Sequence, residues 1–171
     1  MKYFTPSEAV QLIESGESIY IQGSTSIPEV LCQALADRGE ELRDVTIYAA
    51  FAVGRCEAPF CKPEYKDSFN VKSLFVANNI RRWLAAGYGS TIPAFLGEIP
   101  GLFRDGTLPL DAVFLNVSPP NDEGYCSFGV SADLAVSALE CARKVIVQVN
   151  KAMPFSYGDA LIHISRIDAA V

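Results

Sequence analysis

The sequence predicts an α/β fold with an open, mainly parallel sheet flanked by helices. Short strand-like segments alternate with helical patterns along all 171 residues. This alternation is typical of βαβ units with right-handed crossovers. In addition, segments 111–117 and 144–149 are almost continuously apolar, as expected of strands that are covered on both faces. We therefore expect helices on both sides of a parallel sheet.

The first half of the chain opens with a helix that begins at Thr5. The segment Thr5-Pro6-Ser7-Glu8 combines a hydroxyl N-cap, a proline at the first helical position and a capping-box glutamate, and Gly16 ends the helix. The remaining elements predicted here are a strand at 18–22, a helix at 29–36, strands at 45–51 and 74–77, and a helix at 80–86 followed by a turn at Gly87 and Gly89.

The second half continues the pattern. It is predicted to hold a helix at 94–103 interrupted at Pro100-Gly101, a strand at 111–117, an alanine-rich helix at 131–142 and a strand at 144–149. Segment 160–168 alternates like a strand and is followed by only three residues, which indicates a chain that continues in its natural context. Because no linker or repeat is evident, we expect residues 1–171 to form a single domain.

Composition and charge exclude several classes of partner. Twenty acidic and fourteen basic residues give a net charge of -6, which repels a phosphate backbone, so no nucleic acid partner is expected. The longest apolar runs are far shorter than the roughly 20 residues that span a bilayer, so no membrane association is expected. No signal peptide is evident, and five irregularly spaced cysteines favour a reducing compartment, by default the cytoplasm.

The loop at 118–131 is the sharpest local feature, because it leaves a buried strand and leads into a helix. Ligands of open α/β sheets bind at the carboxyl ends of strands. Its prolines stiffen the backbone, and its glycines allow close approach and positive φ values. The residues alone leave open whether the loop binds a ligand or only connects strand to helix.

Two further loops occupy the same kind of position. In the loop containing Gly23, Ser24, Thr25 and Ser26, free N–H groups at a helix N-terminus would hold an anion or an oxyanion, although helix capping by serine or threonine is an alternative. The spacing fits neither a P-loop nor a dinucleotide fingerprint. With the loop at 150–159, three loops are expected to line one cleft.

Other candidate residues point to structural roles. His163 is the only histidine and lies in a strand-like pattern, so no catalytic triad is expected. Cys56 and Cys61 lack a second ligand pair for zinc, and no metal site is predicted. The remaining charged candidates, Glu98, Glu123, Arg81 and Arg82, are interpreted as solvated surface groups.

Two long motifs resemble those of a known family. Residues 117–131, Val-Ser-Pro-Pro-Asn-Asp-Glu-Gly-Tyr-Cys-Ser-Phe-Gly-Val-Ser, resemble the VSPPDxxGYCSLGVS signature of the acetyl-CoA hydrolase/CoA-transferase family. Residues 149–168, with Met153-Pro154, Gly158-Asp159 and Ile162-His163, are similar to the family's VNxxMPxxxGDxxIHxSxID. A third match covers residues 92–111, and the resemblance extends over the whole chain.

The resemblance implies a fold, an activity and partners. Family members have a NagB/RpiA/CoA-transferase-like α/β domain, two of which form one subunit, and they transfer CoA between short-chain carboxylic acids. An enzyme glutamate in the C-terminal domain attacks the acyl-CoA and becomes a glutamyl-CoA thioester. Coenzyme A would thus be a substrate with no other cofactor, the C-terminal domain a partner, and this chain alone inactive; a homo-oligomer is expected.

The resemblance also carries over substrate-binding residues, and it assigns no catalytic residue to this chain. Serine and threonine replace glycines of the family's glycine-rich loop at 23–26, which leaves an oxyanion role open, and His163 and Asp159 are assigned to structure. The expected substrate-binding residues are Gly23, Ser24, Thr25, Ser118, Pro119, Asn121, Gly124, Tyr125, Ser127, Met153 and Pro154.

Two alternative functions stay open. In an acyl-CoA hydrolase, water would resolve the same intermediate. In a non-catalytic ligand-binding or assembly module, the surface that otherwise docks a second domain would be polar rather than apolar.

Overall fold

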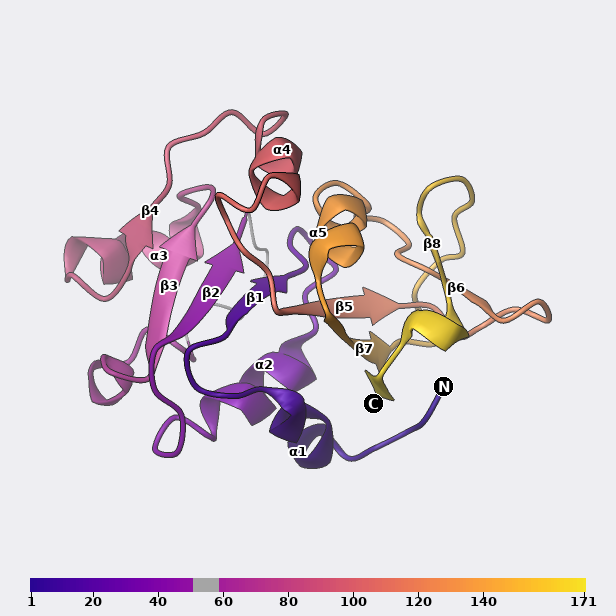
Figure 1. The fold of residues 1–171 in the computed structure, drawn as a ribbon, viewed down its shortest axis with the longest axis horizontal. Helices are drawn as coiled ribbons and strands as arrows, with labels where there is room; N and C mark the ends of the chain where they lie inside the picture. The colour runs from indigo at the N-terminus through magenta and orange to yellow at the C-terminus, as the bar shows by residue number, and fades with distance from the viewer. Residues whose placement is uncertain (51–58) are drawn as a thin grey trace.

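The computed structural model describes residues 1–50 and 59–171 and confirms the predicted α/β class. One open sheet of seven strands, all parallel, has the order β4-β3-β2-β1-β5-β7-β9 (Figure 1). The strands are β1 (Ser18–Ile21), β2 (Val45–Ala49), β3 (Phe69–Ser73), β4 (Ser90–Thr91), β5 (Ala112–Val117), β7 (Lys144–Val149) and β9 (Ala169–Ala170).

Helices cover both faces of this sheet, as predicted. They are α1 (Pro6–Ala9), α2 (Glu29–Ala36), α3 (Asn78–Ala85), α4 (Ile99–Arg104) and α5 (Ala135–Cys141), with short 3₁₀ helices at Val10–Leu12, Pro63–Tyr65 and Ile164–Arg166. Alternate side chains of β1 point to opposite faces. Ile19 and Ile21 belong to the core shared with α1 and α2, whereas Tyr20 belongs to the core shared with α4 and α5.

The direction of the strand order reverses between β1 and β5. From β1 the chain proceeds outward through β2, β3 and β4, and from β5 it proceeds the opposite way through β7 and β9 (Figure 1). The loop after β1 leads to α2 on one face, and the segment after β5 leads to α5 on the other. Loops 23–28 and 118–131 both start at this reversal. In open α/β sheets, ligands bind outside the carboxyl ends of the strands at such a point.

A second, two-stranded sheet lies beside the carboxyl ends of β5 and β7 (Figure 1). It pairs β6 (Tyr125–Ser127) with β8 (Leu161–His163) in antiparallel fashion, with Tyr125 opposite His163. Strand β6 was not predicted from the sequence.

Two strand predictions are wrong. Segment 74–77 is not a strand: β3 ends at Ser73, and Phe75 O accepts bonds from Ser73 Oγ (2.8 Å) and Ala77 N (3.0 Å), which turn the chain out of the sheet. Segment 160–168 is not one strand but β8 followed by a 3₁₀ helix, because His163 caps that helix by accepting from Ser165 N.

Helix boundaries differ from the predictions at several places. Pro100 does not interrupt α4 but lies in its first turn, where a proline has no intrahelical N–H bond to lose. The chain turns at Gly129, with φ +63°, and α5 begins only at Ala135. Helix α1 is one turn long and continues as a 3₁₀ helix. Position 51 of the predicted strand 45–51 and Cys56 lie outside the described residues.

Within residues 1–50 and 59–171, no helix has the length and apolar character needed to cross a membrane.

Candidate functional site

The loops after β5 and β7 pack against each other. Ser127 Oγ accepts from Ser156 N at 3.0 Å, and Ser156 Oγ donates to Gly129 O at 2.8 Å. Gly129 lies so close to Met153 that an added Cβ would be 2.1 Å from Met153 Sδ. Segments 118–131 and 150–159 therefore form one packed unit at the carboxyl edge of the sheet.

Ser118 and Ser127 hold the base of this unit. Ser118 Oγ accepts from Ser127 N (2.9 Å), and Ser118 N donates to Ser127 O (2.9 Å). Both serines are buried, whereas Pro119 and Pro154 are exposed and Met153 is buried. The serine hydroxyls thus form hydrogen bonds within the protein, and these bonds stabilise the loop that carries the exposed residues.

Asn121, Gly124 and Tyr125 form the outer end of the loop. Asn121 Oδ1 accepts from Glu123 N (3.1 Å) and Tyr125 N (2.8 Å), which closes the turn. Gly124 has φ +82°, and a Cβ there would lie 2.9 Å from His163 Nε2. The rings of Tyr125 and His163 are 5.0 Å apart, so β8 supports this end.

The loop after β1 contains Gly23, which is buried, Ser24, which is half-buried, and Thr25, which is exposed. Ser24 has φ +58°, a left-handed conformation that is uncommon outside glycine, asparagine and aspartate. Such conformations cost free energy and cluster at ligand sites.

Helix capping by serine or threonine, the alternative role considered for this loop, is wrong for α2. Its N-cap is Pro28, without a side-chain hydrogen bond. Val30 N instead donates to Gln148 Oε1 of β7 at 3.0 Å. The serine and threonine side chains of the loop therefore do not cap α2.

Three carboxamides at the ends of β1, β5 and β7 were missed by the sequence analysis. Gln22 directly follows β1, and Asn116 and Gln148 are register partners in β5 and β7. Asn116 Nδ2 lies 3.4 Å from Ile27 O. Gln22 directly follows its strand, and Asn116 and Gln148 are each the next-to-last residue of theirs; this repeated position is the signal that could have revealed them.

Two buried polar atoms beside this point have no hydrogen-bond partner among the described residues. They are Ser26 Oγ and Asn116 Oδ1, in residues that are 0% and 5% exposed. Because burial of an unpaired polar atom costs free energy, these two atoms leave hydrogen-bonding capacity unused at the carboxyl ends of β1 and β5.

The predicted residues fall into two groups rather than one continuous cleft. Gln22 connects the loop after β1 to Phe128 and Ser131, but within residues 1–50 and 59–171 no hydrogen bond joins Gly23–Thr25 to Asn121–Tyr125. The three described cavities, of about 680, 270 and 250 Å³, are lined by other residues.

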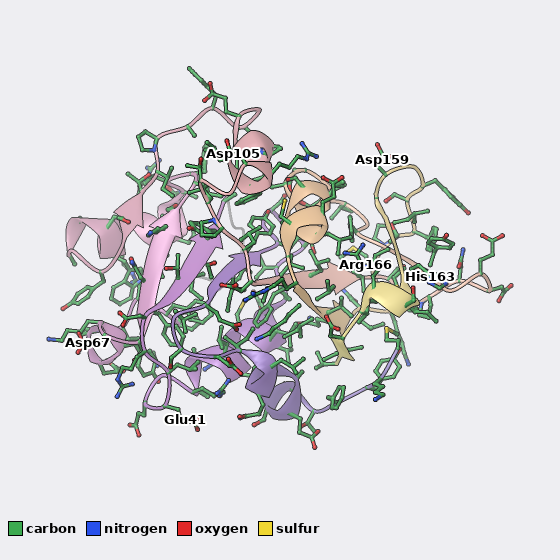
Figure 2. The ribbon with its side chains drawn as sticks, viewed as in Figure 1. Glu41, Asp67, Asp105, Asp159, His163 and Arg166 are labelled. Carbon is green, nitrogen blue, oxygen red and sulfur yellow. The ribbon has the colours of Figure 1, made fainter. Side chains whose placement is uncertain are left out.

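His163 has the structural role expected for it, but Asp159 does not. His163 Nδ1 lies 2.8 Å from Ser165 Oγ, and its ring supports Tyr125. Figure 2 shows Asp159 at the far end of its loop, well separated from His163. Asp159 is exposed, so the connection between loop and strand comes from His163.

Cysteine and metal chemistry find little support in the described part of the chain. Burial raises the pKa of the Cys126 thiol to about 11, which keeps it protonated and unreactive at neutral pH. Residues 1–50 and 59–171 contain no group of three His, Cys, Asp or Glu side chains that could hold a metal ion.

The family follows from a match over the full chain. Residues 1–171 match the model of the acetyl-CoA hydrolase/transferase N-terminal domain. The chain belongs to this family. As an acetyl-CoA hydrolase/transferase domain, it has as homologues 4-hydroxybutyrate, succinyl and butyryl CoA-transferases.

Curated relatives of this acetyl-CoA hydrolase/transferase domain are longer proteins. A 4-hydroxybutyrate coenzyme A transferase of Clostridium kluyveri is 35% identical over 99% of the chain, which covers 39% of that protein. A succinyl-CoA:acetate/propanoyl-CoA:succinate CoA transferase of Fasciola hepatica is 32% identical over 94% of the chain, which covers 33% of that protein.

Solved structures agree. RipA from Yersinia pestis superposes with a TM-score of 0.90 at 31% identity, over 99% of this chain and 41% of that one. A 4-hydroxybutyrate CoA-transferase from Porphyromonas gingivalis gives 0.82 at 32%, over 99% and 38%. The decarboxylase AibA/AibB, at 12% identity and a TM-score of 0.73, shares the fold alone.

Proposed function

We propose that residues 1–171 form one domain that supplies the carboxylate-binding side of a CoA-transferase. The complete enzyme moves CoA between short-chain carboxylic acids in the cytoplasm. The observation that carries this proposal is the membership of the whole chain in the family, together with relatives at 30–35% identity that are CoA-transferases for such acids.

The nucleophile of this reaction is a glutamate outside residues 1–171. Its carboxylate attacks the acyl-CoA thioester, which forms an acyl-glutamyl anhydride and releases the CoA thiolate. The thiolate then attacks the glutamyl carbonyl, so that the first acid leaves and a glutamyl-CoA thioester remains. The second acid takes the CoA by the reverse of these two steps, and the glutamate is regenerated.

The acidic residues near the predicted loops support an external nucleophile. Asp122, Glu123 and Asp159 are exposed, and none of them lies at the reversal between β1 and β5. Nucleophilic carboxylates are typically found in clefts, where they are buried beside other charged groups. Exposed loop carboxylates of this kind are solvated instead.

The binding residues are those predicted on the two loops of the reversal point and on the loop after β7. Thr25, Pro119 and Pro154 are exposed on these loops, and Ser24 holds a left-handed conformation. Backbone N–H groups of these loops would donate to a carboxylate or to a developing oxyanion.

Hydrolysis of acyl-CoA is the second candidate, because the matched family includes hydrolases by its description. Free CoA would be measured on the complete enzyme with and without an acceptor carboxylate. A transferase passes the CoA to the acceptor and releases no net free CoA with or without it, whereas a hydrolase releases free CoA without an acceptor.

Exposed apolar side chains argue against a non-catalytic, self-sufficient module. Phe95, Leu96, Val130 and Tyr157 are 80%, 61%, 59% and 81% exposed. All four lie in segments that follow the carboxyl ends of strands; we call them the apolar rim. Such residues favour contact with further protein, here a C-terminal domain or another copy in a homo-oligomer.

Activity of the purified chain tests the proposal. Acetyl-CoA and labelled butyrate would be incubated with residues 1–171 and, separately, with the complete enzyme that carries them. We expect labelled butyryl-CoA only with the complete enzyme. Turnover by the chain alone would show that the nucleophile lies within it.

A further inference from the structure

Gln22 makes three polar contacts at the point where the two substrate loops separate. Its side chain is 0% exposed. Oε1 accepts from Asn116 N at 2.7 Å, and Nε2 donates to Ser131 O at 2.7 Å, with Phe128 O at 3.5 Å. These groups belong to β1, β5 and the segment that leads into α5.

The contact with Asn116 replaces a backbone bond of the sheet. Gln22 N donates to Phe114 O at 3.0 Å, as in a regular parallel ladder. The next bond of such a ladder would run from Asn116 N to the backbone oxygen of Gln22. The side-chain oxygen accepts it instead, so the backbone is free to leave the sheet at Gly23 while the sheet bond is kept.

The second half of the carboxamide fixes the other loop. Nε2 holds the carbonyl of Ser131, the last residue of the loop after β5. Ser131 Oγ in turn donates to Asp133 Oδ2 at 3.0 Å, within the turn that precedes α5. One buried side chain thus fixes the distance between the loop after β1 and the end of the loop after β5.

We propose that Gln22 is a positioning residue of the substrate site. It holds the loop containing Gly23, Ser24 and Thr25 at a fixed distance from residues 128–131, at the carboxyl ends of β1 and β5. Gln22 acts through these loops and does not itself touch the reacting atoms. The effect on catalysis rests on the proposed function, whereas the effect on the loops does not.

A carboxyl group in place of the carboxamide gives a pH-dependent test. In Gln22→Glu, the protonated acid can still accept from Asn116 N and donate to Ser131 O. The ionised form cannot donate to Ser131 O, and repulsion by the carbonyl oxygens of Ser131 and Phe128 displaces the carboxylate, so that Asn116 N also loses its acceptor. Burial and these oxygens raise the pKa of the new carboxyl above that of an unfolded glutamate. Loop positioning is therefore intact at low pH and lost as the pH rises through the folded pKa.

Amide hydrogen exchange on the purified chain measures the positioning directly. After correction for intrinsic rates, Asn116 N–H in Gln22→Glu should exchange at least about tenfold faster than in the wild type at pH 8, and close to the wild-type rate at pH 5. Gln11→Glu, at an exposed glutamine of the first helical segment, is the matched control and should show no such change. A pH-independent rate in Gln22→Glu, equal to that of the control, would overturn the proposal.

Kinetics of the complete enzyme separate positioning from a purely structural role. In Gln22→Glu, the KM for the acceptor carboxylate should rise about fivefold or more between pH 5 and pH 8 relative to the wild type, with the KM for acyl-CoA unchanged. Equal pH profiles would contradict the link to substrate binding, even if Asn116 exchanges faster. If the wild-type enzyme transfers no CoA, the proposed function fails, and the exchange measurement still decides the role of Gln22.

Discussion

Gly129 shows how a single residue joins two loops. It has φ +63°, and a Cβ there would come within 2.1 Å of Met153 Sδ and 3.1 Å of Pro154 O. Both the conformation and the space require glycine. The sequence indicated that the glycines of this loop allow close backbone approach, but it could not reveal that the approaching group is Met153, because the two lie 24 positions apart and meet only through the fold.

Gly129→Ala should destabilise the protein by about 1–3 kcal/mol, because the methyl group forces Met153 aside and the left-handed backbone is strained. Urea unfolding followed by circular dichroism measures the change. Gly97→Ala is the control, since Gly97 has free space around its Cα and no positive φ; it should be close to neutral. Equal midpoints for the two variants would contradict the close packing of these loops.

Cys126 should resist alkylation in the folded protein. Burial raises the pKa of its thiol to about 11, so at pH 8 almost no thiolate is present. Iodoacetamide labelling with peptide mass spectrometry should leave Cys126 unmodified in the native chain and modify it in urea. Fast native labelling at pH 8 would show that β6 opens readily.

At the scale of elements, the sequence predicted best where one local rule decided the outcome. The capping box at Thr5 and Glu8 forms as predicted, with Thr5 N donating to Glu8 Oε2 at 2.8 Å. The prediction failed where tertiary bonds decide the ends of strands. β3 alternates apolar Phe69 and Val71 with polar Asn70 and Lys72, whereas the apolar pattern predicts the strand in the segment that follows.

The amino ends of the central strands depend on one carboxylate. Asp111 Oδ2 accepts from Ser18 N (2.8 Å) and Ser18 Oγ (3.1 Å), while Oδ1 binds Arg143 Nη2 (2.5 Å). This side chain connects β1, β5 and the approach to β7. Asp111, the single charged residue of segment 111–117, thus joins the strand ends, which the pattern of apolar runs alone does not indicate.

Asp111→Ala should lower the free energy of unfolding by about 2–3 kcal/mol, because it leaves the part-buried Ser18 N–H without its acceptor. Differential scanning calorimetry measures the loss. Asp122→Ala, at an exposed position of the loop after β5, should shift the melting temperature little. A small effect at Asp111 would mean that the strand ends are held mainly by backbone pairing.

At the scale of the molecule, the fold class was predictable, but the strand order was not. Alternating strands and helices indicated a parallel sheet, and all seven strands are parallel. The reversal between β1 and β5 depends on which strands pair across more than ninety positions, and local patterns do not encode such pairing. For the same reason the two groups of predicted site residues could be listed, but their separation could not be foreseen.

The apolar rim predicts the solution behaviour of the chain. Phe95→Ser combined with Leu96→Ser should reduce self-association in sedimentation velocity, because it removes exposed apolar surface. The melting temperature should not change, because both side chains lie outside the core. Leu12→Ser is the control: this side chain is 39% exposed and lies in the first helical segment, away from the rim. Equal association by all variants would show that the rim is not a contact surface.

We propose that this domain holds the substrate while the nucleophile lies elsewhere. The covalent intermediate should then form outside residues 1–171, and its position can be measured. The complete enzyme would be loaded with acyl-CoA, treated with borohydride to reduce the glutamyl thioester to an alcohol, and digested for peptide mass spectrometry. We expect the reduced glutamate in a peptide outside residues 1–171. A reduced glutamate or aspartate within residues 1–171 would contradict it.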